Sequence, residues 1–229
     1  PLITPPALSI MTRTMPRGDF LRATVTLHQG QTLQPGEFIR NCVTLGYEPA
    51  NIVIAPGQFA RRGGILDIWP PAEAQPIRLE FFGNEIETLR PFEPATQRTI
   101  KQPDSTISPR VLVTPAREYL IEIEANQLAN ENKYSEFHIP LLHSTPASLL
   151  DYLPPQTLLI IDDRQALADI INEVEEQAVH MRQDFIRDGT LAEDFPIPYL
   201  TWSEIEETIS NYREIDLGLP SIDYVEQSG

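Results

Sequence analysis

The sequence predicts an α/β fold in two lobes, a small, mainly antiparallel β-sheet with one helix and then a second α/β lobe. Short alternating runs from 64 to 92 are separated by turn-forming residues, which is typical of a β-meander. An apolar run at 158–161 precedes a long helical stretch. Prolines and polar residues between 101 and 109 indicate a boundary in a chain long enough for two domains. We therefore expect a connector at 1–19 and domains at 20–115 and 116–229.

The first domain begins with a β-branched strand at 24–28 and a helix at 35–45. Pro35 suits the first helical position, and Gly46 suits a left-handed exit. Gly83-Asn84 is typical of a two-residue hairpin turn between strands. The remaining expected elements are strands at 51–55, 64–69, 77–82, 85–89 and 111–113, with a loop at 70–76.

Strand alternation divides the side chains of 77–82 between two faces. Ile77, Leu79 and Phe81 share the apolar face, and Arg78, Glu80 and Phe82 share the other. The hairpin turn sets Ile86 beside Phe81 and Glu85 beside Phe82. If the 70–76 loop closes symmetrically, position 64 lies opposite 82 and position 68 opposite 78. Arg62 then extends past Phe82 on the same face, although a slip of one residue would reverse it.

The same alternation groups Ile65, Asp67 and Trp69 on the apolar face of their strand. We expect Trp69 to be a core residue rather than a binding aromatic. Asp67 fits this face poorly, so we expect it to form local hydrogen bonds and assign it no function.

The second domain should be built around the apolar strand at 158–161. We expect that strand to be buried and followed by a helix at 164–187, with Asp163 as its cap and Gly189 as its stop. A further helix at 202–212 shows a capping signal at Ser203 to Glu206. We also expect a helix at 116–130 and a loop at 131–143.

Charge is distributed unevenly along the chain. Residues 1–115 hold 11 Lys and Arg against 10 Asp and Glu, whereas residues 116–229 hold 6 against 23. The acidic half is a poor surface for nucleic-acid phosphates. The sequence has one cysteine, Cys42, no apolar run of membrane-spanning length and no visible signal peptide. These features favour a cytoplasmic protein, and we expect no membrane association.

No catalytic constellation stands out. Asp162-Asp163 after an apolar strand resembles the magnesium-binding acidic pair of nucleotide hydrolases, but the chain has no GxxxxGK[ST] loop to hold a phosphate. The four histidines show no metal-ligand spacing. We therefore expect no catalytic residues, no metal and no cofactor.

The face that carries Arg62, Arg78 and Phe82 has two interpretations. It is either a docking surface for another protein or a second packing layer. In the second case Phe82 is buried under the 35–45 helix and Arg78 pairs with Glu80 or Glu87.

Residues 24–115 resemble a bacterial nucleotide-excision-repair family, the homology module shared by the repair helicase UvrB and the transcription-repair coupling factors. The resemblance rests on Arg62-Gly-Gly-Ile-Leu-Asp-Ile-Trp-Pro70, Arg78-Leu-Glu-Phe-Phe-Gly-Asn-Glu-Ile86 and Phe92-Glu-Pro-x-Thr-Gln-Arg98, among shorter matches. Thr96-Gln97-Arg98 is similar to a coupling-factor segment, and Asp162-Asp163-Arg164-Gln165 departs from the helicase box of UvrB. The second domain then resembles a degenerate, ATP-incompetent helicase-like lobe.

This resemblance implies a non-catalytic module that recruits UvrA to stalled transcription. It implies that Arg62, Arg78 and Phe82 contact UvrA, and we expect Gly63, Gly64, Glu80 and Glu85 to support them. It also implies masking by a C-terminal domain in a full-length, ATP-dependent DNA translocase. RNA polymerase and DNA would bind domains outside this chain, which we expect to be an N-terminal fragment. The alternative is a piece of UvrB, an ATP-dependent DNA helicase.

Overall fold

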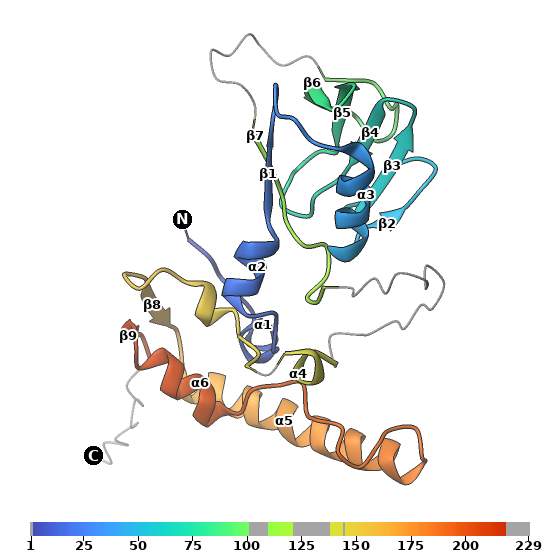
Figure 1. The fold of residues 1–229 in the computed structure, drawn as a ribbon. Coiled ribbons are helices and arrows are strands. Elements are labelled where there is room, and N and C mark those ends of the chain that lie inside the picture. The colour runs from blue at the N-terminus through green and yellow to red at the C-terminus, as the bar shows by residue number, and fades with distance from the viewer. Residues whose placement is uncertain (1, 101–109, 121–137, 144, 219–229) are drawn as a thin grey trace, which may run out of the picture. The chain divides into compact units, whose positions relative to one another are not determined.

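The structure is a computed structural model that describes residues 2–100, 110–120, 138–143 and 145–218. It divides into two compact units (Figure 1). The sheet unit is residues 18–133, and the second unit combines residues 1–17 with residues 134–229. The expected boundary segment at 101–109 lies outside the described residues.

The sheet unit contains a five-stranded sheet in the order β2-β3-β4-β5-β6. β2 pairs with β3 in parallel, and the other neighbours are antiparallel. The small, mainly antiparallel sheet with a helix is therefore confirmed. Its strands are β2 (Glu48–Pro49), β3 (Gln58–Arg62), β4 (Ile65–Ile68), β5 (Ile77–Phe82) and β6 (Glu85–Pro91), and β1 (Val25–His28) pairs separately with β7 (Arg110–Val113).

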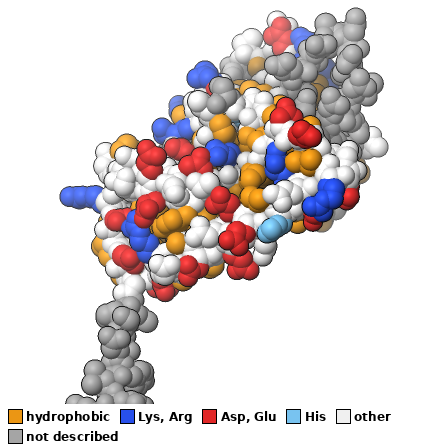
Figure 2. Space-filling model, turned by 90° about the horizontal axis from the view of Figure 1, so that it is seen from below, with side chains coloured by type: hydrophobic (Ala, Val, Ile, Leu, Met, Phe, Trp, Pro, Cys, Tyr) orange, Lys and Arg blue, Asp and Glu red, His pale blue; other side chains and the backbone are white. Residues whose placement is uncertain are grey.

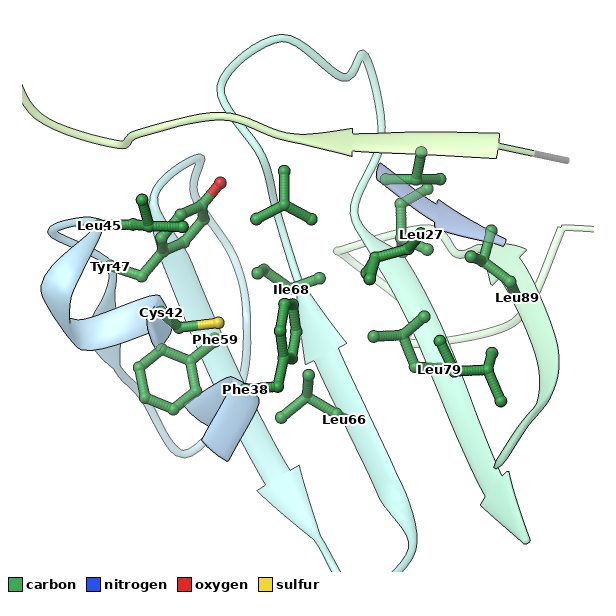
Figure 3. Close-up of a cluster of buried hydrophobic side chains, with 14 residues drawn as sticks. Leu27, Phe38, Cys42, Leu45, Tyr47, Phe59, Leu66, Ile68, Leu79 and Leu89 are labelled. Atoms are coloured by element: carbon green, nitrogen blue, oxygen red, sulfur yellow. The ribbon is translucent and has the colours of Figure 1, made fainter. Parts of the chain in front are cut away.

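Helix α3 (Pro35–Thr44) covers one face of this sheet (Figure 1). It starts at Pro35 and exits through Gly46, whose φ of 81° lies in the left-handed region that favours glycine. Figure 3 shows Phe38 and Cys42 of this helix directed toward the apolar face of the sheet. The buried core comprises Leu27, Phe38, Cys42, Leu45, Tyr47, Phe59, Leu66, Ile68, Ile77, Leu79, Ile86, Leu89, Val111 and Val113.

Two of the elements expected in the residues of the sheet unit are wrong. Residues 51–55 form no strand, because the backbone N–H groups of Ile54 and Ala55 donate to the Gln58 side chain instead of a neighbouring strand. Residues 116–119 are bends and residue 120 is irregular rather than helical, and 121–130 lie outside the described residues. An additional helix that the sequence did not suggest, α2 (Arg17–Ala23), precedes β1.

The expected register between β4 and β5 is wrong by one residue. Ile68 lies opposite Ile77, and Ile65 lies opposite Glu80. The backbone N–H of Phe81 donates to the carbonyl of Gly64 at 2.8 Å, so Gly64 faces Phe81 rather than Phe82. The β5–β6 pairs next to the turn are as expected, with Phe81 opposite Ile86 and Phe82 opposite Glu85, and the register of the two strands shifts between Glu80 and Phe81.

This shift exchanges the faces of β4. Leu66 and Ile68 join the core, whereas Ile65, Asp67 and Trp69 belong to the opposite side of the sheet. Trp69 is partly buried there and packs against a small separate cluster of Val53, Ala60 and Phe92. Trp69 is thus a packing residue, but it does not belong to the main core.

The second unit contains the N-terminal residues that the sequence suggested were a connector. Met11, at the end of α1 (Ala7–Met11), is completely buried with Ile171 and Ile205 of two longer helices. Those helices are α5 (Arg164–Arg187) and α6 (Trp202–Ile209). The remaining elements are α4 (Ile139–Leu142), a 3-10 turn (Leu150–Tyr152), and the parallel strands β8 (Leu158–Ile161) and β9 (Arg213–Asp216).

Several details of this unit differ from expectation. β8 is buried on one face only: Ile161 lies in the core cluster with Leu159 packed against it, whereas Leu158 and Ile160 on the other face are exposed. The cap of α6 is Thr201 with Glu204, two residues before the expected signal. α4 occupies part of the expected 131–143 loop, of which 131–137 lie outside the described residues. Asp163 caps α5 as expected, since its side chain accepts from the Ala166 N–H at 2.9 Å.

Candidate functional site

The sheet face opposite α3 carries Arg78, Glu80 and Phe82 of β5, as their alternation requires. Phe82 is 78% exposed, and its neighbour Phe81 packs partly buried against the core. Phe82 therefore does not lie under α3, and the interpretation of this face as a second packing layer is wrong for Phe82.

Arg62 reaches this face by a route different from the expected one. Gly63 and Gly64 form the turn between β3 and β4, and Gly63 has a φ of 62°. Arg62 thus ends β3 and lies opposite Ile65, which in turn lies opposite Glu80. Two differences from the expected geometry have opposite effects on the face of Arg62. The turn at Gly63–Gly64 places Arg62 on a separate strand, and the register between β4 and β5 is shifted by one residue. Arg62 lies on the face of Arg78 and Phe82, one strand farther away than expected.

Asp67 holds the two arginines together. Its side chain is completely buried, and Arg78 lies directly opposite it on the neighbouring strand. Arg78 binds it through two parallel hydrogen bonds, Nε to Oδ1 at 2.7 Å and Nη2 to Oδ2 at 2.8 Å. Arg62 adds a third, from Nη2 to Oδ2 at 2.8 Å. We call Arg62, Asp67 and Arg78 the arginine–aspartate cluster.

Arg78 is fixed from other directions as well. Its guanidinium carbon lies 4.7 Å from the centre of the Phe92 ring, a cation–π contact, and its Nη1 donates to the Gln97 carbonyl at 3.2 Å. Gln97 has a φ of 59°, and its side chain donates to the carbonyls of Val53 and Pro94. The hydrogen bonds from Arg78 to Asp67 raise the pKa of Arg78, and partial burial opposes this shift. The Arg78 guanidinium is therefore a cation fixed by Asp67, the Gln97 carbonyl and the Phe92 ring.

The expected supporting residues have distinct surroundings. Glu80 is half-buried and accepts from the Thr88 hydroxyl at 2.7 Å, so it pairs with neither arginine. Glu85 is exposed opposite Phe82. Gly63 and Gly64 help to line a small surface pocket of about 130 Å³. A Cβ atom on Gly64 would lie 3.2 Å from the Phe81 carbonyl oxygen, which is a tight contact.

Sequence reasoning missed three residues of this site, namely Asp67, Phe92 and Gln97. The signal for Asp67 was present, because it is the only acidic residue of its strand and a correct register puts it directly opposite Arg78. The pairing of Arg78 with Glu80 or Glu87, weighed above, is wrong for the same reason.

The acidic pair of the second unit, Asp162-Asp163, differs from Asp67 in its exposure. Asp162 and Asp163 are exposed, and Asp163 serves as the cap of α5. Among the described residues, no group of three or more His, Cys, Asp or Glu side chains could hold a metal ion. Acidic side chains are scattered among basic and apolar ones on the face in Figure 2. No helix in the described part of the chain is long and apolar enough to cross a membrane.

The sheet unit is similar to a known protein family. Residues 25–119 match the family described as the UvrB interaction domain. The transcription-repair-coupling factor of Bacillus subtilis (strain 168) is 24% identical over 237 residues, which cover 87% of this chain and 20% of that protein. The factor of Staphylococcus haemolyticus (strain JCSC1435) is 25% identical over 77% of this chain and 19% of its own length.

UvrABC system protein B is also similar. The protein of Gloeobacter violaceus is 28% identical over 63% of this chain and 27% of its own length. The chain thus spans between about a fifth and a quarter of the length of these curated relatives. The matched residues contain both arginines of the cluster, Asp67 and Phe82. The part of this chain from residue 25 to residue 119 thus matches the UvrB interaction domain family.

Proposed function

We propose that the sheet unit is a non-catalytic docking module for UvrA, and that it binds through the face that carries Arg62, Arg78 and Phe82. The observation that carries the proposal is the exposure of Phe82. A phenylalanine exposed by 78% on a strand of the sheet buries little apolar surface in the isolated unit, whereas an aromatic side chain is a common anchor in a protein interface.

The surroundings of Phe82 favour a protein partner. Arg62 leaves about half of its side chain exposed on the same face, at 52%. An exposed aromatic side chain and a half-exposed arginine on one sheet face are the composition of an interface core. Nucleic acid fits less well, because residues 116–229 hold 6 basic against 23 acidic residues and repel phosphates.

The relatives lead us to extend this proposal to the whole protein. We place the chain with the coupling factors rather than with UvrB, because matches to coupling factors cover 87% and 77% of it, against 63% and 52% for two UvrB proteins. In this proposal the module recruits UvrA to stalled transcription during nucleotide excision repair. A C-terminal domain masks it in the full-length protein, and other domains bind RNA polymerase and DNA.

The test is the binding of purified UvrA to the immobilised chain, measured by biolayer interferometry. The wild-type chain should bind UvrA, and Phe82→Ala should weaken binding by about thirtyfold or more. Phe185→Ala is the matched control, since Phe185 is 42% exposed but lies on α5 of the second unit. The proposal is wrong if wild type shows no binding, or if Phe82→Ala binds as well as Phe185→Ala.

A further inference from the structure

The two arginines of the cluster are bound to Asp67 in unequal ways. Arg78 alone satisfies both carboxylate oxygens, one through Nε and the other through Nη2. Arg62 contributes a single further hydrogen bond to Oδ2, an oxygen that Arg78 already binds. Removing Arg62 therefore leaves the buried carboxylate paired and hydrogen-bonded. Removing Arg78 takes away the bidentate partner of a buried charge.

The two arginines also differ in the exposure of their side chains. The Arg78 side chain is 15% exposed and is also bound by Phe92 and the Gln97 carbonyl, whereas the Arg62 side chain is 52% exposed. Arg78 and Asp67 neutralise each other, so the cluster as a whole carries one surplus positive charge. Arg62, the more exposed arginine with a single hydrogen bond to Asp67, carries that surplus charge.

We infer that Arg62 is an exchangeable arm: on docking it leaves Asp67 and binds a carboxylate of the partner, while Arg78 stays on Asp67 as a fixed support that does not contact the partner. This inference rests on the proposed function and sharpens it. The partner surface that fits has one acidic side chain beside an apolar recess for Phe82. Arg78 is then a positioning residue, although its sequence position suggests a second contact.

The melting temperatures of variants at Arg62 and Arg78 test the inference without any partner protein. The chain has two tryptophans, so a Trp202→Phe background leaves Trp69 as a fluorescent reporter of the sheet unit alone. In this background Arg62→Ala should shift the melting temperature of the sheet unit by less than about 4 °C. Arg78→Ala should lower it by about 10 °C or more. Arg61→Ala is the control. Arg61 is exposed and precedes Arg62 in β3, so its side chain lies on the other face of the sheet.

Binding supplies the second readout, on variants that stay folded at the assay temperature. Arg78→Lys keeps the positive charge on Asp67 but loses the planar fork, so a direct carboxylate contact of Arg78 would suffer from it. Where it stays folded, Arg78→Lys should lose less UvrA binding than Arg62→Ala loses. Arg62→Ala should bind about tenfold more weakly or worse, and Arg61→Ala should bind normally.

Two results would overturn the inference. One is a melting shift for Arg62→Ala as large as that for Arg78→Ala. The other is a folded Arg78→Lys that loses UvrA binding to the extent that Arg62→Ala does. A wild-type chain that does not bind UvrA refutes the proposed function instead, and the melting comparison still decides whether Arg62 is the releasable arginine.

Discussion

Asp67 of the sheet unit is buried, whereas the acidic pair of the second unit, Asp162-Asp163, is exposed. Asp67 lies in the middle of the sheet, completely buried, and receives three hydrogen bonds from two arginines. Asp162 and Asp163 follow β8 in the open, where Asp163 caps a helix. From the sequence alone the exposed pair resembled a magnesium-binding pair but was expected to have no catalytic role, and Asp67 was assigned no function. The comparison teaches that burial and bound partners, rather than a suggestive motif, decide where an acidic residue matters.

The largest contrast should come from deleting each carboxylate. Asp67→Ala leaves Arg78 mostly buried without its anion, so the sheet unit should lose about 3–5 kcal/mol of unfolding free energy. Asp162→Ala should change the stability of the second unit by no more than about 0.5 kcal/mol, because its side chain is exposed. Urea unfolding, followed by Trp69 fluorescence for the sheet unit and by circular dichroism at 222 nm for α5, measures both. Equal losses would remove the distinction between the two acidic sites.

The second contrast lies within the sheet unit, between the neighbours Phe81 and Phe82. Phe81 packs against the core, so Phe81→Ala should destabilise the unit by about 2–4 kcal/mol. Phe82→Ala should cost no more than about 0.5 kcal/mol, because its ring is largely exposed. The same Trp69 fluorescence curves provide the comparison. If Phe82→Ala unfolds as readily as Phe81→Ala, Phe82 is a packing residue and the docking face fails.

A smaller effect is expected at Asp163. Asp163→Ala removes the cap of α5 and should cost the second unit about 1 kcal/mol. Asp163→Asn retains an acceptor for the Ala166 N–H and should recover most of this loss. Unfolding monitored by circular dichroism at 222 nm checks the pair. A cost that Asn fails to reduce would show that the charge of Asp163, rather than its capping bond, is what matters.

The smallest expected signal is ATP hydrolysis. The chain lacks a phosphate-binding loop, and the Asp162 carboxylate belongs to no metal-ligand cluster among the described residues. Phosphate release should therefore remain at background, with or without DNA. DNA-stimulated turnover that disappears in Asp162→Ala would give the exposed pair the catalytic role that we deny it.

The sequence predicted the elements that carry strong local signals. The Gly83-Asn84 turn placed Phe82 opposite Glu85, and Pro35 with Gly46 delimited α3. The register across the loop between β4 and β5 was out of reach, because a long Pro-rich loop does not dictate how its two strands align.

Other parts of the site were out of reach for different physical reasons. The positive φ of Gln97, whose carbonyl accepts from Arg78, has no glycine to signal it. Arg62 shares the face of Arg78 only because the Gly63–Gly64 turn starts a new strand, which alternation within one strand does not reveal. The three expected contact residues nevertheless share one face, since Arg78 and Phe82 alternate within a single strand.

The most direct test of the account asks whether Phe82 touches UvrA. Replacing Phe82 with the photocrosslinking residue p-benzoylphenylalanine places a reactive group at the proposed anchor without removing the aromatic ring. Irradiation with purified UvrA should give a covalent adduct of the combined mass on a denaturing gel. The same residue at Phe185 of the second unit should give none. An adduct at Phe185 and none at Phe82, in a chain that binds UvrA, would contradict the docking face.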